Sequence, residues 1–349
     1  MYGFLTNKKM ELRRRNMQKK IRIGVVAAGA IATKYHIPGY LSCDNVEIIG
    51  ISDLNQELAT KVAQKYGIKN VYTDYKDLLA QKPDAISICT PNRFHAAIAI
   101  EALNKNINVL CEKPLAMNME ECKALEKAEQ DSEAFLMVEF PMRYDRAYQK
   151  AHELIEKGVL GKITIIKSTW NHGGPEKWSP NGSWFYKPEL AGGGALADLG
   201  VHNIDIVRFL AGGNVQMTKS FCKTQVKDST LEDSAVVILC FENQVLGIVD
   251  ASWCTGPQQV KTEIQGTNGR MELFGWPTNT MKLTLEGELD GVFEPVFSSN
   301  KGEHDPHIIC VRKFVECVKE GRPPLSGTIE DGIQALEIIS KAYNDKMTI

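Results

Sequence analysis

Residues 192–205 hold the side chains whose types and spacing are best suited to chemistry in this chain. Asp198 and His202 lie four residues apart, and on a helix this spacing places both side chains on one face. A histidine beside a carboxylate can transfer a proton near neutral pH. Three glycines directly upstream let the backbone approach a ligand closely. The alternative is an ordinary amphipathic helix with solvated polar side chains, and this segment alone does not decide between the two.

A turn after the first predicted strand, residues 21–26, approximates a dinucleotide-binding pattern. Relative to G-x-G-x-x-G/A, Ala27 replaces the first glycine, Gly29 is the residue that approaches a pyrophosphate, and Ala32 is an allowed third small residue. The turn gains support from its place between a predicted strand and a predicted helix. We expect a pyrophosphate to contact Ala28, Gly29, Ala30 and Ile31.

Asp53 follows the next predicted strand, residues 46–52, at the position where dinucleotide-binding folds hold a ribose. Its carboxylate can accept hydrogen bonds from both ribose hydroxyls and would repel a 2′-phosphate. No arginine follows in Asp53-Leu54-Asn55. These features predict NAD rather than NADP as the cofactor. The alternative interpretation of Asp53 is a helix cap.

Two polar segments follow later predicted strands, at 85–90 and 107–111. Because the carboxyl ends of parallel strands meet at the ligand-binding edge of an open sheet, we expect both segments to contact the cofactor. Lys113, followed by a proline, is placed to hold its ammonium beside a nicotinamide and a substrate hydroxyl. The candidate cofactor residues in these segments are Thr90, Pro91, Asn92, His95, Glu112 and Lys113.

Together these motifs resemble those of the glucose–fructose oxidoreductase/inositol dehydrogenase/MocA (Gfo/Idh/MocA) family of two-domain dehydrogenases, from residue 21 onward. The specific elements are Glu112-Lys113-Pro114 and the glycines followed by an aspartate and a histidine; Ala27 is the one departure. The resemblance implies that Lys113, Asp198 and His202 are catalytic. It also implies a Rossmann domain joined to an open-faced sheet domain, and pairing of such sheets between subunits.

Oxidation of an alcohol requires a base for the hydroxyl proton while a hydride passes to nicotinamide. We expect His202 to be that base, Asp198 to orient its ring or relay the proton, and Lys113 to stabilise the reacting oxygen. The predicted activity is an NAD-dependent dehydrogenase acting on a CH–OH group of a sugar, polyol or cyclitol. Two alternatives stay open: a redox-neutral glycosidase or epimerase-type enzyme, and a non-catalytic dinucleotide-binding sensor.

Aromatic residues gather just before the glycines, which favours a carbohydrate-like substrate because aromatic faces stack on the C–H faces of sugar rings. Positions in the core or in a subunit interface are the alternative for these rings. Asn171 and His172, at the end of a predicted strand, are candidates to bind substrate hydroxyls, as is Trp184 together with the three catalytic candidates. The aromatic residues are Trp170, Trp178, Trp184, Phe185 and Tyr186.

The order of predicted elements indicates an α/β fold in two domains. In residues 21–142, short apolar strands alternate with amphipathic helices, which predicts an NAD-binding Rossmann domain with a doubly wound parallel sheet. In residues 143–349, longer alternating segments predict an α+β domain for substrate binding and oligomerisation, built on a mostly antiparallel sheet. Arg143, at the boundary, is predicted to form an ion pair between domains or to contact the substrate. Asp205 is a weaker catalytic candidate, with bracing of its helix as the alternative. Helices predicted to cover one face of the second sheet span 196–210, 306–319 and 329–343.

Composition narrows the class of function. A formal net charge of −2 gives no support for a nucleic-acid or membrane partner, although the basic residues 1–20 predict a disordered, solvated tail. No apolar stretch approaches the roughly 20 residues that span a bilayer. Nine scattered cysteines without a CxxC pair predict reduced thiols, a cytoplasmic location and no metal site. We also expect a homodimer or homotetramer, because an uncovered apolar sheet face is normally buried.

Overall fold

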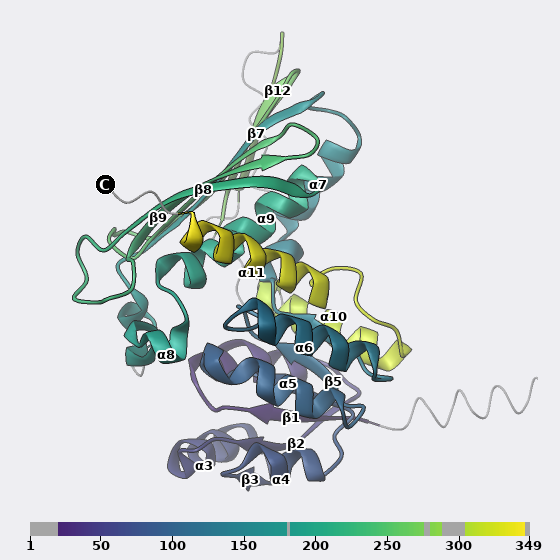
Figure 1. The fold of residues 1–349 in the computed structure, drawn as a ribbon. Helices are drawn as coiled ribbons and strands as arrows, with labels where there is room; N and C mark the ends of the chain where they lie inside the picture. Colours follow the sequence, from purple (N-terminus) through teal and green to yellow (C-terminus); the bar gives the residue numbers. More distant parts are fainter. Residues whose placement is uncertain (1–19, 180–181, 276–279, 288–303, 346–349) are drawn as a thin grey trace, which may run out of the picture.

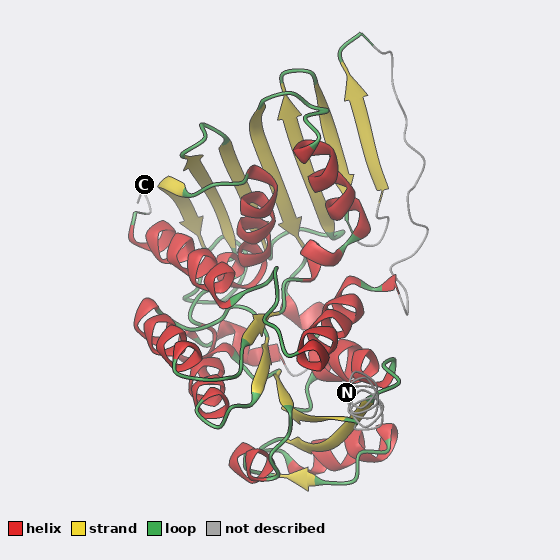
Figure 2. Ribbon diagram, turned by 90° about the vertical axis from the view of Figure 1, so that its right-hand side faces the viewer, coloured by secondary structure: helices red, strands yellow, loops and turns green. Residues whose placement is uncertain are grey.

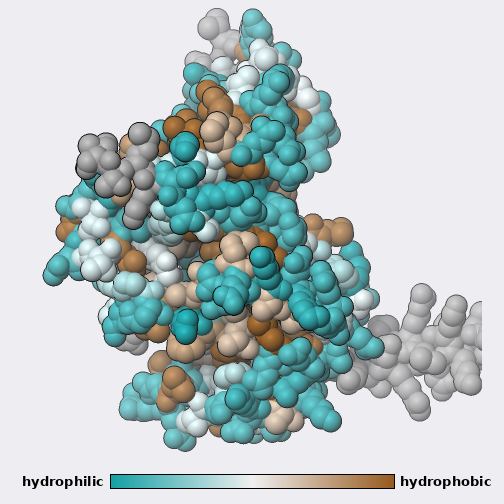
Figure 3. Space-filling view, viewed as in Figure 1, coloured by the Kyte–Doolittle hydropathy of each residue, from teal (hydrophilic) through white to brown (hydrophobic). Residues whose placement is uncertain are grey.

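The computed structural model describes residues 20–179, 182–275, 280–287 and 304–345, so the predicted tail lies outside it apart from an exposed Lys20. The described residues form two sheets, one above the other in Figure 1, with helices packed between them. Hydrophilic side chains cover most of the face seen in Figure 3, with hydrophobic residues in small groups among them. Within the described ranges, no helix combines the length and the apolar character needed to cross a bilayer.

The first sheet is parallel, with the strand order β3-β2-β1-β4-β5-β6. The order reverses between β1 and β4, and open α/β sheets bind ligands at such a switch point. Its strands are mostly uninterrupted apolar runs because helices bury both faces of the sheet. The strands are β1 (Ile21–Val26), β2 (Val46–Ser52), β3 (Val71–Tyr72), β4 (Ala85–Ile88), β5 (Asn108–Cys111) and β6 (Leu136–Val138).

The helices around this sheet alternate with its strands as predicted. Sequence analysis missed the short strand β3 and the short helix α4. Two-residue strands and six-residue helices are too short to show a clear period in the sequence. The first helix begins with a π-helical turn, η1 (Ala32–His36), and continues as α2 (Ile37–Leu41). The others are α3 (Gln56–Tyr66), α4 (Tyr75–Ala80), α5 (His95–Leu103) and α6 (Met119–Gln130), with short 3-10 turns η2 (Asn92–Phe94) and η3 (Pro141–Tyr144).

The helix predicted at 306–319 does not cover the second sheet, contrary to the expectation. It forms α10 (Pro306–Glu320) and packs on α2 and β1, where Val311 shares a core with Tyr40. Gly39 permits this contact, because a Cβ there would lie 2.8 Å from the Val311 side chain. The prediction was wrong because amphipathic spacing shows that a helix face is buried but not against which partner.

The second sheet has the order β13-β12-β11-β7-β10-β9-β8; only β7 and β10 pair in parallel. Figure 2 shows helices lying across one face of it, and α7 (Arg146–Glu156), α9 (Val201–Ala211) and α11 (Ile329–Asn344) make these contacts. Helix α11 also packs on α6 and β6, between the two sheets. The strands are β7 (Ile163–Asn171), β8 (Val215–Lys223), β9 (Ser234–Phe241), β10 (Leu246–Ser252), β11 (Gln259–Gly266), β12 (Gly269–Phe274) and β13 (Thr280–Leu285).

The opposite face of the second sheet carries large apolar side chains that remain exposed at one end, on β8, β9 and β10. Alternate residues along each strand face opposite sides, so these side chains lie together on the side away from α9. The predicted fold class, a Rossmann-type parallel sheet followed by a mostly antiparallel sheet, is confirmed. The exposed residues are Met217, Phe221, Val236, Ile238 and Leu246.

Candidate active site

A cavity of about 320 Å³ lies where the two sheets and α10 meet. Its walls come from η1, from the carboxyl end of β5, from the segment after β7 and from α10. Another wall comes from the π-helical turn η6 (Leu196–Gly200) and the start of α9. Lys113, Asp198 and His202, which sequence analysis grouped as catalytic, all line this one cavity.

The predicted dinucleotide turn has the backbone that such a turn requires. Ala27 adopts a φ of +79°, in the left-handed region that the motif normally fills with glycine, and this costs on the order of 1 kcal/mol. Space beyond the Cα of Gly29 is open, with no atom within 4 Å of a Cβ built there. Asp53 accepts hydrogen bonds from the backbone N–H groups of Ala28 and Asn55, both at 2.8 Å. The substitution at Ala27 therefore leaves the turn geometry intact.

The segment after β4 is held mainly by protein contacts. The buried ring of His95 lies 2.9 Å from the Thr90 carbonyl and 2.8 Å from that of Pro114, so both ring nitrogens are engaged. His95 thus braces the two cofactor segments against each other, and the contact with a dinucleotide that sequence analysis expected of it stays a prediction. Asn92 donates to the carbonyl of Ala191 at 2.8 Å. The buried Thr90 hydroxyl has no partner among the described residues, which leaves it free for a ligand.

Lys113 and Asp198 form an ion pair at the centre of the cavity. The Lys113 Nζ lies 2.8 Å from the Asp198 Oδ1 and also donates to the backbone carbonyl of Asp198 at 3.0 Å. The other carboxylate oxygen accepts from the indole N–H of Trp253 at 3.1 Å. Trp253 is fully buried. Both carboxylate oxygens of Asp198 therefore accept hydrogen bonds. Sequence analysis missed Trp253, which lies 55 residues further along the chain, directly after β10.

His202 is a buried imidazole with an unused nitrogen. Its ring stacks on Trp170 with centroids 4.9 Å apart, and within the described chain its Nδ1 has no hydrogen-bond partner. Burial first, and then the positive charges of Lys113 and His307, lower the pKa of His202 well below its usual value. The imidazole is therefore neutral at pH 7 and able to accept a proton. Sequence analysis expected Asp198 to orient this ring or to relay the proton. The first expectation was wrong, because the oxygens of Asp198 bond Lys113 and Trp253 instead; the relay stays a prediction.

Glu112 is held by a histidine that sequence analysis did not single out. His36, fully buried on η1, lies with its Nε2 2.9 Å from Glu112 Oε1 and its Nδ1 2.9 Å from the Ser87 hydroxyl. Burial raises the pKa of Glu112, but the hydrogen bond and charge of His36 outweigh it, so the pKa is lowered. Glu112 therefore faces the cavity as a carboxylate and fixes the segment that carries Lys113.

Only part of the predicted substrate set reaches the cavity. Trp170, Trp178 and His172 line it. Asn171 does not, because neighbouring residues at the end of a strand point to opposite sides. Trp184 does not either: it stacks on Phe185 at 3.9 Å, in an aromatic cluster that continues to Trp170 and Trp178 on the cavity wall.

The glycines before Asp198 serve packing within the protein rather than approach to a ligand, which corrects the expectation. A Cβ at Gly194 would clash with the carbonyl oxygen of Glu232. The half-buried Glu232 carboxylate accepts from the backbone N–H groups of Gly194 at 3.1 Å and Leu196 at 2.9 Å. It also accepts from the Tyr343 hydroxyl at 2.8 Å. This carboxylate caps the turn that carries Asp198.

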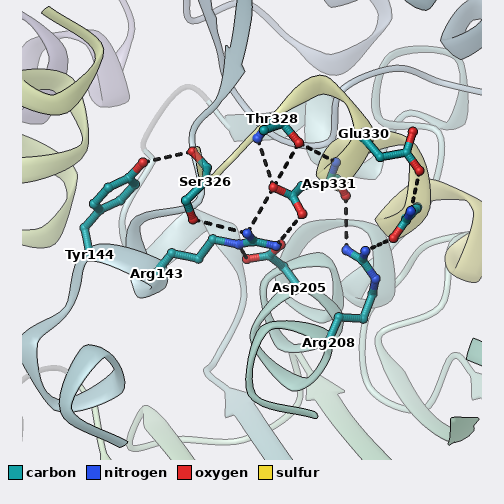
Figure 4. Close-up of polar contacts among 9 residues, drawn as sticks. Arg143, Tyr144, Asp205, Arg208, Ser326, Thr328, Glu330 and Asp331 are labelled. Atoms are coloured by element: carbon teal, nitrogen blue, oxygen red, sulfur yellow. Dashed lines mark hydrogen bonds and ion pairs between the residues drawn. The ribbon is translucent and has the colours of Figure 1, made fainter. Parts of the chain in front are cut away.

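Arg143 is an ion-pairing residue rather than a substrate contact, as Figure 4 shows. Its guanidinium bonds Asp205 at 2.7 Å and Asp331 at 2.8 Å, and donates to the Ser326 hydroxyl at 3.2 Å. These contacts tie η3, which follows the first sheet, to α9 and to the start of α11. Asp205, one turn after His202, has both carboxylate oxygens bonded to Arg143. It therefore braces the helix, which was the alternative that sequence analysis gave for it.

One more cavity residue escaped sequence analysis. His307, the second residue of α10, lines the cavity and bonds the buried Glu139. No local pattern marks it, because the sequence does not show that α10 packs beside η1. Within the described ranges, no group of three or more histidine, cysteine or acidic side chains is arranged to hold a metal ion.

Comparisons with known proteins agree with this architecture. Residues 21–140 match the family model described as "Oxidoreductase family, NAD-binding Rossmann fold", and residues 148–272 match the "GFO/IDH/MocA C-terminal domain". The predicted NAD-binding Rossmann fold is thereby confirmed.

Curated relatives match over most of their length. A myo-inositol 2-dehydrogenase of Thermotoga maritima is 27% identical over 328 residues, which cover 90% of this chain and 93% of the relative. A scyllo-inositol 2-dehydrogenase (NAD(+)) of Bacillus subtilis is 26% identical, covering 94% of each. Among solved structures, a levoglucosan dehydrogenase in complex with NADH superposes with a TM-score of 0.84 at 24% identity, covering 94% of this chain and 98% of that one.

Proposed function

This chain belongs to the GFO/IDH/MocA family of oxidoreductases, and from that membership we propose that it oxidises a ring hydroxyl of a sugar, polyol or cyclitol with NAD. The observation that carries the proposal is the neutral, unpartnered imidazole of His202 in the same cavity as the Lys113–Asp198 ion pair. A base and a cation on one cavity match the needs of alcohol oxidation.

The residues around the glycine turn fit NAD. The left-handed backbone at Ala27 and the open space at Gly29 form a cradle for a pyrophosphate. The Asp53 carboxylate stands where a ribose diol would be held, and the unpaired Thr90 hydroxyl offers a further contact. Bound NAD supplies the hydride acceptor for the reaction.

Each residue of the cavity has a defined role in the proposed mechanism. His202 accepts the proton of the substrate hydroxyl, which its neutral form can do at pH 7. Lys113 donates a hydrogen bond to the same oxygen and stabilises the negative charge that develops there. Asp198, fixed by Trp253, holds the Lys113 ammonium in place. Trp170 and Trp178 line the cavity, and indole rings suit the C–H face of a sugar ring.

The test is formation of NADH by the purified protein with NAD and a panel of inositols, hexoses and sugar acids, including phosphate- and nucleotide-linked forms. We expect the absorbance of reduced nicotinamide to rise with at least one neutral polyhydroxylated ring compound. In a His202→Asn variant, kcat should fall by about 10²- to 10⁴-fold. His152→Asn is the matched control, because His152 lies on α7 outside the cavity. Substrate conversion without free NADH would favour a redox-neutral enzyme, and tight NAD binding without conversion would favour a sensor.

We also propose that two copies of the chain associate through the open face of the second sheet. Met217, Phe221, Val236 and Ile238 are between 41% and 51% exposed and adjoin one another on β8 and β9. An apolar group of this kind on a sheet face fits the same face of a second copy. Light scattering after size exclusion should give a dimer or tetramer, and Ile238→Lys should shift it toward the monomer.

We also propose that the protein resides in the reducing cytoplasm, since all nine cysteines are free thiols.

A further inference from the structure

His307 lines the same cavity as Asp198 and His202 but comes from another element, helix α10. It is the second residue of α10, capped by Asp305, and its side chain lines the cavity beside Tyr35 of η1. The mechanism proposed above does not use it. A polar ring at this position faces whatever ligand fills the space next to Lys113.

The ring of His307 is fixed in orientation. Its Nδ1 lies 2.9 Å from Glu139 Oε1, and Glu139 is fully buried. Tyr35 stacks on the ring with centroids 4.1 Å apart and an interplanar angle of 19°. The side chain is 22% exposed, and no residue in the described part of the chain bonds its Nε2. A ring held in this way presents one free nitrogen to the cavity.

In the protonated ring that nitrogen is a donor, and Glu139 favours the protonated form. Burial disfavours the charged ring, but the charge and hydrogen bond of Glu139 outweigh it and raise the pKa of His307. The protonated ring donates from both nitrogens, one to Glu139 and the other to the cavity. The buried Glu139 carboxylate also compensates the charge of the protonated ring, so His307 offers a hydrogen-bond donor without a net charge that would bind an anion.

The other charges of the cavity point to the same kind of ligand. The carboxylates that line it are those of Glu112, Asp145, Asp198 and Asp305. The lysines are Lys113, which is paired with Asp198, and Lys34, which donates to the carbonyl of Trp178. Four carboxylates against two lysines leave this cavity without the cluster of cations that would hold a substrate carboxylate or phosphate. A hydroxyl group fits a single oriented N–H donor.

We infer that His307, oriented by Glu139, donates a hydrogen bond to a second, non-reacting hydroxyl of the substrate and thereby selects polyhydroxylated rings over simple alcohols. The inference rests on the proposed function for the identity of the reacting hydroxyl. It adds a substrate contact from α10, an element other than the one that carries the base.

The test uses binding as well as turnover. Tryptophan fluorescence of the NADH-loaded protein reports binding, because Trp170 and Trp178 line the cavity. The probes are myo-inositol, D-glucose and, as a ring with one hydroxyl, cyclohexanol. We expect His307→Gln to weaken binding of the polyhydroxylated probes by about tenfold and to raise their KM similarly. Cyclohexanol binding, NAD binding and kcat should change less than about twofold. His152→Gln is the matched control.

The outcomes separate this inference from the proposed function. Equal affinities in wild type and His307→Gln, with turnover retained, overturn the inference and leave the function standing. Polyol binding that the variant loses, in a protein that forms no NADH, supports the contact and overturns hydride transfer. A wild type that binds no polyhydroxylated probe overturns both. If His307→Gln does not fold because Glu139 is left as an unpaired buried charge, the double variant His307→Gln/Glu139→Gln removes that charge and carries the same test.

Discussion

The Lys113 ammonium lies 2.8 Å from a carboxylate oxygen of Asp198, in an ion pair between residues 85 positions apart. Lys113 lies two residues beyond the end of β5 in the first sheet, whereas Asp198 lies on the turn that packs against the second sheet. The lysine also donates to the backbone carbonyl of Asp198. The cavity that holds the proposed active site is therefore complete only when both halves of the chain are packed together.

Removing the ammonium should affect both catalysis and stability. Lys113→Met keeps the length of the side chain but leaves the buried Asp198 carboxylate with only Trp253 as a charge-stabilising partner. We expect the free energy of unfolding to fall by about 3 kcal/mol and kcat to fall at least about 10²-fold. Denaturant unfolding and NADH formation measure the two effects. Lys61→Met, at an exposed helix position, is the control and should match wild type in both. A Lys113→Met enzyme with wild-type kcat would refute the proposed role.

Trp253 should matter through its single hydrogen bond. Trp253→Phe keeps an aromatic ring in the core but leaves Asp198 Oδ2 without its donor at 3.1 Å. An unsatisfied buried acceptor costs about 2 kcal/mol, and a less rigid carboxylate should lower kcat by about tenfold. NAD affinity should stay unchanged, since Trp253 lies away from the glycine turn. If NAD binding weakens together with kcat, the effect is one of general unfolding rather than of Asp198 alone.

The choice between NAD and NADP should depend on Asp53. In Asp53→Ala, the backbone N–H groups of Ala28 and Asn55 lose their acceptor, and a ribose loses a charged partner. We expect NAD affinity to fall by about 10- to 100-fold, and the preference for NAD over NADP to shrink because the charge that repels a 2′-phosphate is gone. Isothermal titration with both dinucleotides measures this. An unchanged ratio of the two affinities would assign Asp53 to a purely structural role, as the acceptor for the N–H groups of Ala28 and Asn55.

Asp205 should stabilise the protein without taking part in the chemistry. Asp205→Asn removes one of the two carboxylates that neutralise the buried Arg143 guanidinium. The expected loss is about 3 kcal/mol in the free energy of unfolding, because a charge inside the protein then lacks part of its compensation. At a temperature where the variant is folded, KM should remain near wild type. An exposed pair, Lys127–Asp131, offers the control: Asp131→Asn should leave stability unchanged within error.

Activity in the direction of alcohol oxidation should resist mild acid. Burial, followed by the charges of Lys113 and His307, lowers the pKa of His202, so this base loses its neutral form only well below pH 6.5. The acid limb of the kcat/KM profile should therefore lie below the pH at which an ordinary histidine titrates. Since His307 contributes to the shift, His307→Gln should move this limb toward higher pH. An acid limb at or above pH 6.5 in the wild type would argue against His202 as the base.

The features that depend on local sequence pattern could be predicted before the structure was known. Apolar runs and amphipathic spacing gave both sheets, since strand and helix periods are properties of neighbouring residues. The same holds for the glycine turn and Asp53, where positions within one strand–turn–helix unit define the chemistry. Lys113, Asp198 and His202 were identifiable because each lies in a short motif with a recognisable spacing.

Contacts between side chains that are far apart in the sequence became known from the packing of the folded chain. Asp198 bonds Lys113 and Trp253 instead of His202, although His202 is four residues away and the others are far along the chain. His307 reaches the cavity because α10 packs on α2, a choice made by surface fit between helices rather than by helix period. Burial likewise sets the low pKa of His202, and burial is a property of the packed molecule that no local spacing encodes.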